Sequence, residues 1–241
     1  MRSAQGQWRA VWMVLAGLLA AFTFAGPAQA DDSPAADQAL LTQLGLMRGH
    51  LRMGSELTDA GNAKQAALHY HHPLKELYDQ IAPELTARGI TDLGAELKGL
   101  EQAADTGGDV KPPLAKVLST IDLAEGSVTA SPKMMLAAVV GLLRHADEEY
   151  GAAFTPAGVL DKREEYQDSW GFVRKAAEIF NRVRVNLAKR DPAPIRDIAK
   201  DLLTLQTAWP NLDGPAKPVI DGAGVKAIVD RIEKTAAAYR G

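Results

Sequence analysis

The sequence predicts an all-α protein, an antiparallel helical bundle of about seven to eight helices. Aromatic residues make up only 6% of the 241 residues, whereas Ala and Leu, which favour helices, are abundant. Residues that begin and end helices recur along the chain at helix-length intervals. No segment alternates apolar and polar residues as a half-buried strand does, so we expect no sheet.

The first thirty residues have the layout of a secretory signal peptide. Arg2 and Arg9 precede an apolar run over residues 10–24, and an Ala-x-Ala pattern ends at Ala30. The run is shorter than the roughly 20 residues of a membrane span. We therefore predict cleavage after Ala30 and a soluble periplasmic protein without a membrane span; an uncleaved anchor is the alternative.

Cap and proline residues mark where the helices of the remaining chain begin. Ser33-Pro34 and Ser131-Pro132 each offer an N-cap followed by a proline in the first turn, and Asn62 and Thr91 are further caps. These signals and the apolar periodicity predict helices over residues 34–60, 62–88, 91–107, 112–126, 131–155, 159–190, 194–209 and 225–239. We expect residues 31–241 to form one bundle domain, with two four-helix halves, 31–128 and 129–241, as an alternative division.

The composition excludes several classes of function. The chain has no Cys, which excludes disulfides, thiolate metal sites and Cys nucleophiles. Its formal charge of −3 argues against a nucleic-acid-binding protein, which needs a basic surface. The sequence contains no phosphate-binding loop, dinucleotide fingerprint, serine-hydrolase elbow or H-E-x-x-H motif. A binding protein is therefore expected rather than an enzyme.

The first two predicted helices carry a set of histidines. His50 lies in the middle of the apolar face of the first helix, and His69, His72 and Glu76 form a stripe along the second. A short turn at Gly61-Asn62 makes the two helices an antiparallel hairpin. Because His50 and His72 are equally far from that turn, they should lie at the same height.

Imidazole and carboxylate groups at one height predict a site for a transition metal. They suit Zn, Cu(II) or Fe, and Met47 would add a soft ligand for Cu(I). Pro73 cannot donate a hydrogen bond to the carbonyl of His69, so we expect a kink there. In the alternative, His50 is a core histidine bonded to a buried partner, and the protein is a non-catalytic interaction or scaffold domain.

A second candidate set lies on the helix predicted over residues 131–155. His145, Glu148 and Glu149 share one side of it, with the His-x-x-Glu spacing of di-metal bundle proteins. Glu164, Glu165 and Asp168 follow at the opening of the next helix. Because these residues lie away from the apolar stripes, the alternative is a solvated acidic surface.

The sequence over residues 147–172 resembles the extracytoplasmic helical region fused to bacterial iron permeases. The similarity rests on Asp147, Tyr150, Glu165 and Tyr166, with Phe172 a few residues on. The resemblance implies that these four residues correspond to residues of the iron permease region, and that the bound metal is iron or copper. An inner-membrane transporter or another envelope protein is then the expected partner. The spacing of His145 and Glu148 is also similar to that in imelysin-like periplasmic iron-uptake proteins, which are helical bundles too.

Overall fold

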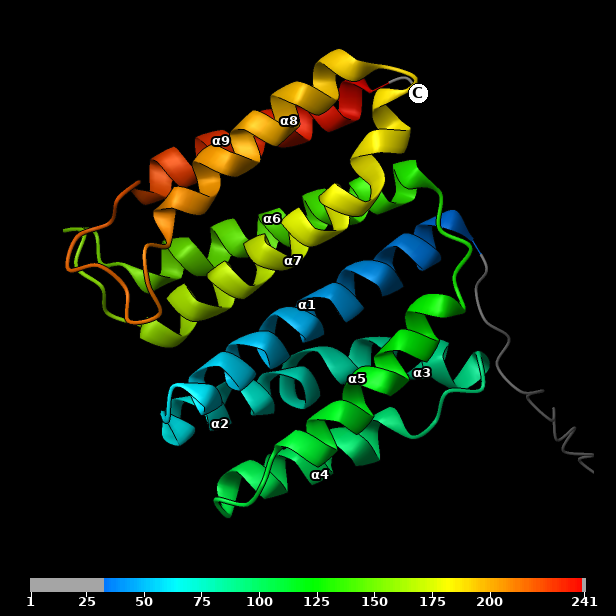
Figure 1. The fold of residues 1–241 in the computed structure, drawn as a ribbon, viewed down its shortest axis with the longest axis vertical. Coiled ribbons are helices and arrows are strands. Elements are labelled where there is room, and N and C mark those ends of the chain that lie inside the picture. Colours follow the sequence, from blue (N-terminus) through cyan, green and yellow to red (C-terminus); the bar gives the residue numbers. More distant parts are fainter. Residues whose placement is uncertain (1–32, 240–241) are drawn as a thin grey trace, which may run out of the picture.

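The computed structural model describes residues 33–239, which fold as a set of packed helices (Figure 1). The helices are α1 Pro34–Asp59, α2 Ala63–His72, the π-helix η1 Pro73–Tyr78, α3 Asp79–Ala87, α4 Leu93–Asp105, α5 Lys111–Gly126, α6 Pro132–Ala153, α7 Arg163–Ala188, α8 Pro192–Leu205, the 3-10 helix η2 Gln206–Ala208 and α9 Gly222–Ala238. Within this range the only β-type pairing is an isolated bridge between Phe154 and Leu160. The predicted all-α bundle is confirmed. The predicted signal peptide, residues 1–30, lies outside the described residues.

Several helix starts follow the cap residues seen in the sequence. Ser33 accepts a hydrogen bond from the backbone N–H of Ala36, and Ser131 accepts one from that of Met134. The prediction for Thr91 was wrong, because Asp92 takes the N-cap position of α4. In residues 33–239 no helix is both long and apolar enough to cross a bilayer.

The start of α7 also differs from the prediction, at Arg163 instead of residue 159. Residues 154–162 form a tight turn instead, in which the N–H of Thr155 donates to the carbonyl of Val159. Gly158 has a φ of 72°, a conformation that glycine adopts without strain. The turn holds α6 and α7 together as an antiparallel pair.

The second predicted helix is continuous but changes its winding at Pro73. Because proline has no N–H, the bond to the carbonyl of His69 cannot form. The backbone widens into the π-helix η1 over the next turn and returns to α-helix at Asp79. Such π segments offset the side chains that follow them and often lie at functional sites. Here the segment begins directly after His72.

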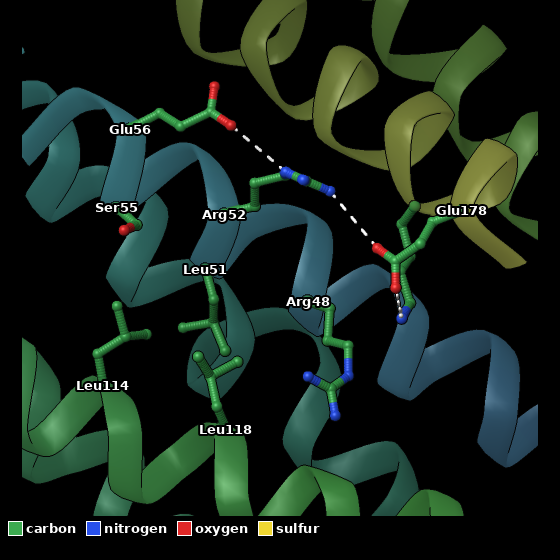
Figure 2. Close-up of a pocket in the computed structure, with 9 residues that line it drawn as sticks. Arg48, Leu51, Arg52, Ser55, Glu56, Leu114, Leu118 and Glu178 are labelled. Atoms are coloured by element: carbon green, nitrogen blue, oxygen red, sulfur yellow. Dashed lines mark hydrogen bonds and ion pairs between the residues drawn. The ribbon is translucent and has the colours of Figure 1, made fainter. Parts of the chain in front are cut away.

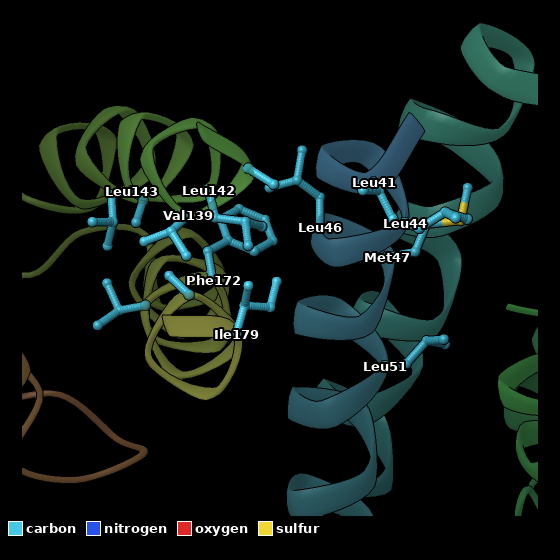
Figure 3. Packing of buried hydrophobic residues seen from close by; sticks show 14 of the residues in the cluster. Leu41, Leu44, Leu46, Met47, Leu51, Val139, Leu142, Leu143, Phe172 and Ile179 are labelled. Atoms are coloured by element: carbon cyan, nitrogen blue, oxygen red, sulfur yellow. The ribbon is translucent and has the colours of Figure 1, made fainter. Parts of the chain in front are cut away.

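Helix α1 lies in the middle of the molecule, between the helix pair α6 and α7 and the helices α2 to α5 (Figure 1). It packs against α6 and α7 on one side and against α2 and α5 on the other, while α9 packs on both α6 and α8. Figure 3 shows the core on both sides of α1, with Leu46 facing Leu142 and Phe172, and Leu44 and Met47 on the side turned away from Phe172.

Two glycines let α1 and α7 approach closely. A Cβ atom on Gly171 would lie 2.5 Å from the carbonyl oxygen of Gly49, and one on Gly49 would lie 2.5 Å from Cδ1 of Phe172. Both distances are far below van der Waals contact, so only glycine fits. The residues next to these glycines, His50 and Phe172, are therefore brought into direct contact.

A cavity of about 330 Å³ lies between α1, α5 and α7, on the polar side of α1 (Figure 2). Its arginines are neutralised by carboxylates. Arg52 lies 3.3 Å from Glu56 and 3.5 Å from Glu178, and Arg48 Nε lies 2.8 Å from Glu125. None of the candidate metal ligands lines this cavity, so it is separate from the histidines.

Candidate metal centre

A single buried carboxylate, that of Asp168 on α7, is surrounded by three imidazoles. Its Oδ1 atom lies 2.6 Å from Nδ1 of His50 and 2.8 Å from Nδ1 of His69. Its Oδ2 atom lies 2.9 Å from Nδ1 of His72. Asp168 is 1% exposed, His50 3% and His69 0%. Four side chains from three helices thus meet at one point inside the bundle.

The α1–α2 hairpin places the three histidines. Gly61 adopts a φ of 76° in the turn between the helices, which reverses the chain within a few residues. The Nδ1 atoms of His50 and His72 lie 3.3 Å apart. The expectation that these two residues lie at the same height is confirmed. His69 precedes His72 by one turn on the same face of α2, so both reach the same carboxylate.

Neighbouring side chains fix the orientation of the rings. Phe172 packs edge-on against the ring of His50, with 4.9 Å between ring centroids. Nε2 of His69 lies 2.9 Å from Oε1 of Gln167, whose amide nitrogen donates to the carbonyl of Leu212. A histidine that donates one ring N–H to an oxygen leaves its other nitrogen to a metal, which is the usual arrangement around metal ligands. Gln167 therefore directs Nδ1 of His69 toward the centre.

The histidines hold Asp168 in its charged form. Burial alone would raise the pKa of this carboxyl, but the charge of His50 and hydrogen bonds from all three histidines lower the pKa well below its ordinary value. Burial opposes the charge on His72 as well. The hydrogen bond and charge of Asp168, with the charges of Glu76 and Glu165, nevertheless raise the pKa of His72 above its ordinary value. Asp168 is therefore ionised at neutral pH, and its charge favours a proton on His72.

The donor set is one that a transition metal can use. One ligand atom from each of His50, His69, His72 and Asp168 can be chosen so that all lie within 4.8 Å of one another. In a tetrahedral site with metal–nitrogen bonds of about 2.0–2.1 Å, neighbouring ligand atoms lie about 3.4 Å apart. The two Nδ1 atoms of His50 and His72 already have nearly this separation. Three imidazoles and one carboxylate suit Fe, Zn or Cu(II).

More carboxylates lie beside the centre. Burial, followed by a hydrogen bond with Glu165 and the charges of Glu165, Asp168 and Glu76, raises the pKa of Glu149 to about 8. Glu149 therefore holds a proton at neutral pH, next to Glu165. Glu76 is exposed, and its Oε1 atom lies 3.9 Å from Nζ of Lys75. Since the side chain of His72 is 14% exposed, this acidic edge lies on the accessible side of the centre.

The other predicted site residues lie apart from the four-residue centre. His145 and Glu148 form a surface pair with 3.6 Å between Nδ1 and Oε2, and the side chain of Glu148 is 73% exposed. Met47 is fully buried among core side chains, beside Leu44 in Figure 3.

Asp168 and Gln167 were not among the predicted ligands. Asp168 was expected with the second candidate set, or on an acidic surface, yet Asp168, Gly171, Phe172 and Lys175 are all buried at helical spacing. Phe172 and Ile179 form a second apolar stripe on this helix. Asp168 lies one turn before Phe172 on the same stripe, so this stripe could have indicated that residue 168 is buried.

Comparison with known proteins concerns the C-terminal part of the chain. Residues 125–241 match the family model of the iron permease-associated 4-helix bundle domain. The match spans 117 of the 241 residues and includes α6, α7, α8 and α9. The resemblance to the iron permease region is confirmed, over a longer stretch than residues 147–172. No curated protein matches the chain, and no solved structure matches it. Asp168 lies in the matched part, whereas the three histidines precede it.

Proposed function

We propose that this protein is a periplasmic metal-binding bundle that takes up, sequesters or delivers a transition metal, iron or copper. The supporting observation is the convergence of His50, His69 and His72 on the buried carboxylate of Asp168. In this proposal residues 1–30 are the signal peptide that exports the chain. An inner-membrane transporter or another envelope protein receives or supplies the metal.

The cost of burying this set favours a metal-binding role over a purely structural one. A core carboxylate needs one or two donors to satisfy it, and one protonated histidine would neutralise it. Three imidazoles around one carboxylate exceed that need, and each ionisable group placed in the interior costs free energy. A bound cation would take one ligand atom from each of the four side chains, and neutral imidazoles and an ionised carboxylate are the forms in which these groups bind metals.

The donor types and their neighbours favour iron or Cu(II) over Cu(I). The convergent atoms are nitrogen and oxygen, which suit the harder ions, whereas thioether and thiolate ligands select Cu(I). The match of residues 125–241 to an iron permease-associated domain supports iron. Glu76 and Glu165 add negative charge that attracts a cation to the accessible side of His72.

Binding is expected to weaken as the pH falls. The ligands must be deprotonated to hold a metal, so protons compete with it. A proton on His72 competes with the metal, because the pKa of His72 is raised in the metal-free fold. Mild acidification should therefore release the metal before the protein unfolds, which suits a protein that passes its cargo on.

Metal analysis and calorimetry test the proposal. Protein isolated from its native envelope without chelators should contain about one equivalent of iron or copper, a stoichiometry that follows from a single four-ligand site. Purified protein should bind Fe(II) or Cu(II) with a micromolar or lower Kd. His50→Ala and Asp168→Asn should each weaken binding at least about tenfold.

Histidines outside the centre provide the controls. His71→Ala is the matched control, because His71 lies on the same helix but pairs with Asp105 at 2.8 Å on the surface. His145→Ala is a second control and should leave binding at the centre unchanged, because His145 lies in a surface pair with Glu148. Equal, weak binding by the wild type and His50→Ala would refute the proposal.

One observation supports a second candidate function, a non-catalytic interaction or scaffold domain with structural histidines. Within residues 33–239 the buried polar atoms of the centre already have hydrogen-bond partners in the protein. In that case Fe(II) and Cu(II) should leave the Tm unchanged. His50→Ala should still destabilise the fold by about 1–3 kcal/mol through the lost buried hydrogen bond.

A further inference from the structure

One end of the bundle carries a concentration of positive charge that the metal centre does not explain. Residues 182–200, at the end of α7 and the start of α8, contain six Lys and Arg against two Asp, a net charge of +4. The whole chain has a net charge of −3, so its other residues together are acidic. The positive charge is therefore local.

Most of these cations are not paired within the protein. We call Arg184, Lys189, Arg190, Arg196 and Lys200 the cationic end. All five side chains are exposed, and none has an ion-pair partner among residues 33–239. Arg182, by contrast, lies 2.7 Å from Glu178. Unpaired surface cations in an acidic protein are available to an external anionic partner.

The cationic end surrounds exposed apolar surface. A groove of about 450 Å³ lies between α7 and α8, lined by Val185, Ala188, Ile195 and Ala199 with Arg184 and Arg196. Val185 is 61% exposed, and Leu203, one turn beyond Ala199 on α8, is 70% exposed. Shallow apolar side chains flanked by Lys and Arg are the composition of surfaces that lie on a bilayer, where the apolar groups enter the headgroup region.

The described chain begins at the same end of the bundle (Figure 1). Gln38, in the first turns of α1, lines a cavity with Lys133, and Lys133 lines another with Arg190. The start of α1 therefore lies near the cationic end.

We propose that the cationic end docks on an anionic phospholipid surface. Arg184 follows Asp168 by sixteen positions on α7, which is roughly 24 Å at 1.5 Å per residue. Docking by this end therefore leaves the metal centre well separated from the bilayer. An acidic protein segment is the competing partner, and it becomes an outcome of the test.

Vesicle co-sedimentation of the chain beginning at Asp31 tests the proposal, because this form keeps all described residues and omits the apolar run. It should bind phosphatidylcholine vesicles that contain about one quarter phosphatidylglycerol, and not vesicles of phosphatidylcholine alone. Since each Lys or Arg near an anionic surface contributes about fivefold in partitioning, the triple variant Arg184→Ala, Lys189→Ala, Arg196→Ala should bind about 100-fold more weakly. Raising the salt concentration should weaken wild-type binding as well.

The matched control removes three cations elsewhere. Lys64, Lys98 and Lys217 are also exposed, and their triple Ala variant changes the net charge by the same amount. It should retain vesicle binding within about threefold. Val185→Ser with Leu203→Ser should weaken binding while leaving all charges in place.

Equal binding to both kinds of vesicle, or equal losses in the two triple variants, would overturn the proposal. So would binding to poly-glutamate without binding to anionic vesicles. Metal titrations of the triple variant should match the wild type, so the result is independent of the metal centre.

Discussion

Replacing Asp168 by Asn is the sharpest test of the centre, because it removes one charge and keeps the size of the side chain. Three Nδ1 atoms lie within 2.9 Å of the carboxylate, which is 1% exposed. An amide has one oxygen acceptor and one N–H₂ donor in place of two acceptor oxygens. At least one imidazole therefore loses its partner, and the positive charge on the histidines is no longer compensated.

The expected loss of stability is large. Removing one partner of a buried ion pair costs about 3–5 kcal/mol. For a domain of 150–250 residues each kcal/mol shifts the Tm by about 2–4 °C. We therefore expect the Tm of the metal-free protein to fall by on the order of 10 °C.

The pH dependence follows from the two shifted groups. The pKa of Asp168 is lowered in the fold, so its contribution is present above its unfolded pKa of about 3.9 and disappears as the pH falls through the folded value. The pKa of His72 is raised, so its contribution is complete below about 6.5 and disappears as the pH rises through the folded value. The difference in Tm between wild type and Asp168→Asn should be largest at about pH 4–6.5 and smaller at alkaline pH.

Thermal unfolding followed by circular dichroism in the presence of a chelator measures this difference. Asp197→Asn is the control, since Asp197 is exposed on α8 and its replacement should change stability by less than about 0.5 kcal/mol. A fall in Tm below about 2 °C for Asp168→Asn, or a difference that does not change with pH, would refute the reasoning.

Three further predictions concern residues around the centre. Glu149→Gln should raise stability at pH 7–8 by about 1–2 kcal/mol, discounted for partial exposure. Burial and Glu165 raise the pKa of Glu149 to about 8. The wild type therefore loses stability as the pH rises from about 4.5 to 8, and the variant does not. An equal loss in the variant, measured by urea titration, would contradict this. Met47→Leu should leave Fe(II) and Cu(II) affinity unchanged at a cost below about 1.5 kcal/mol, and a tenfold loss in calorimetry would instead identify the thioether as a ligand. Gly171→Ala should destabilise the fold by at least about 1–3 kcal/mol and weaken metal binding, because its Cβ would lie 2.5 Å from the carbonyl oxygen of Gly49. Gly151→Ala, in open space on α6, should stabilise by about 0.5–1 kcal/mol, and equal effects of the two substitutions would show that the α1–α7 contact is not tight.

The histidines could be predicted from the sequence because their positions depend on local geometry. The spacing within α2 fixes His69 and His72 on one face, and a short turn fixes the height of His50 opposite them. Both relations involve one hairpin, so no knowledge of distant contacts is needed.

The fourth member of the centre could not be predicted in the same way. Tyr166, Val173 and Phe180 lie at helical spacing on one face of α7, and all three are buried. However, α7 packs against both α1 and α6, so a second face is buried too. Asp168 lies on that second face. The amphipathic pattern of one helix does not say how many neighbours it has, so an aspartate off the main seam looks like a surface residue.

The backbone at Pro73 shows a similar limit. The missing N–H predicts a broken hydrogen bond, and the structure has a π-helix at that point. A kink and a π-turn both accommodate the missing donor. Which one forms depends on how the residues after Pro73 pack against α1 and α4, and this is a tertiary contact.

The centre joins two parts of the chain, and this has a consequence for metal removal. Asp168 belongs to the stretch that matches the iron permease-associated domain, whereas the three imidazoles come from the α1–α2 hairpin that precedes it. A metal held by all four residues bridges α2 and α7, between which there are otherwise few contacts. A metal at 100 times its Kd stabilises the bound form by about 2.7 kcal/mol, and this stabilisation should fall on the hairpin. Chelation should therefore increase amide hydrogen exchange in α1 and α2 by up to about 100-fold and leave α8 and α9 unchanged, because α9 packs on α6 and α8 away from the centre. A uniform increase over all helices would mean that the metal stabilises only the global fold, and no increase anywhere would mean that the histidines hold no metal.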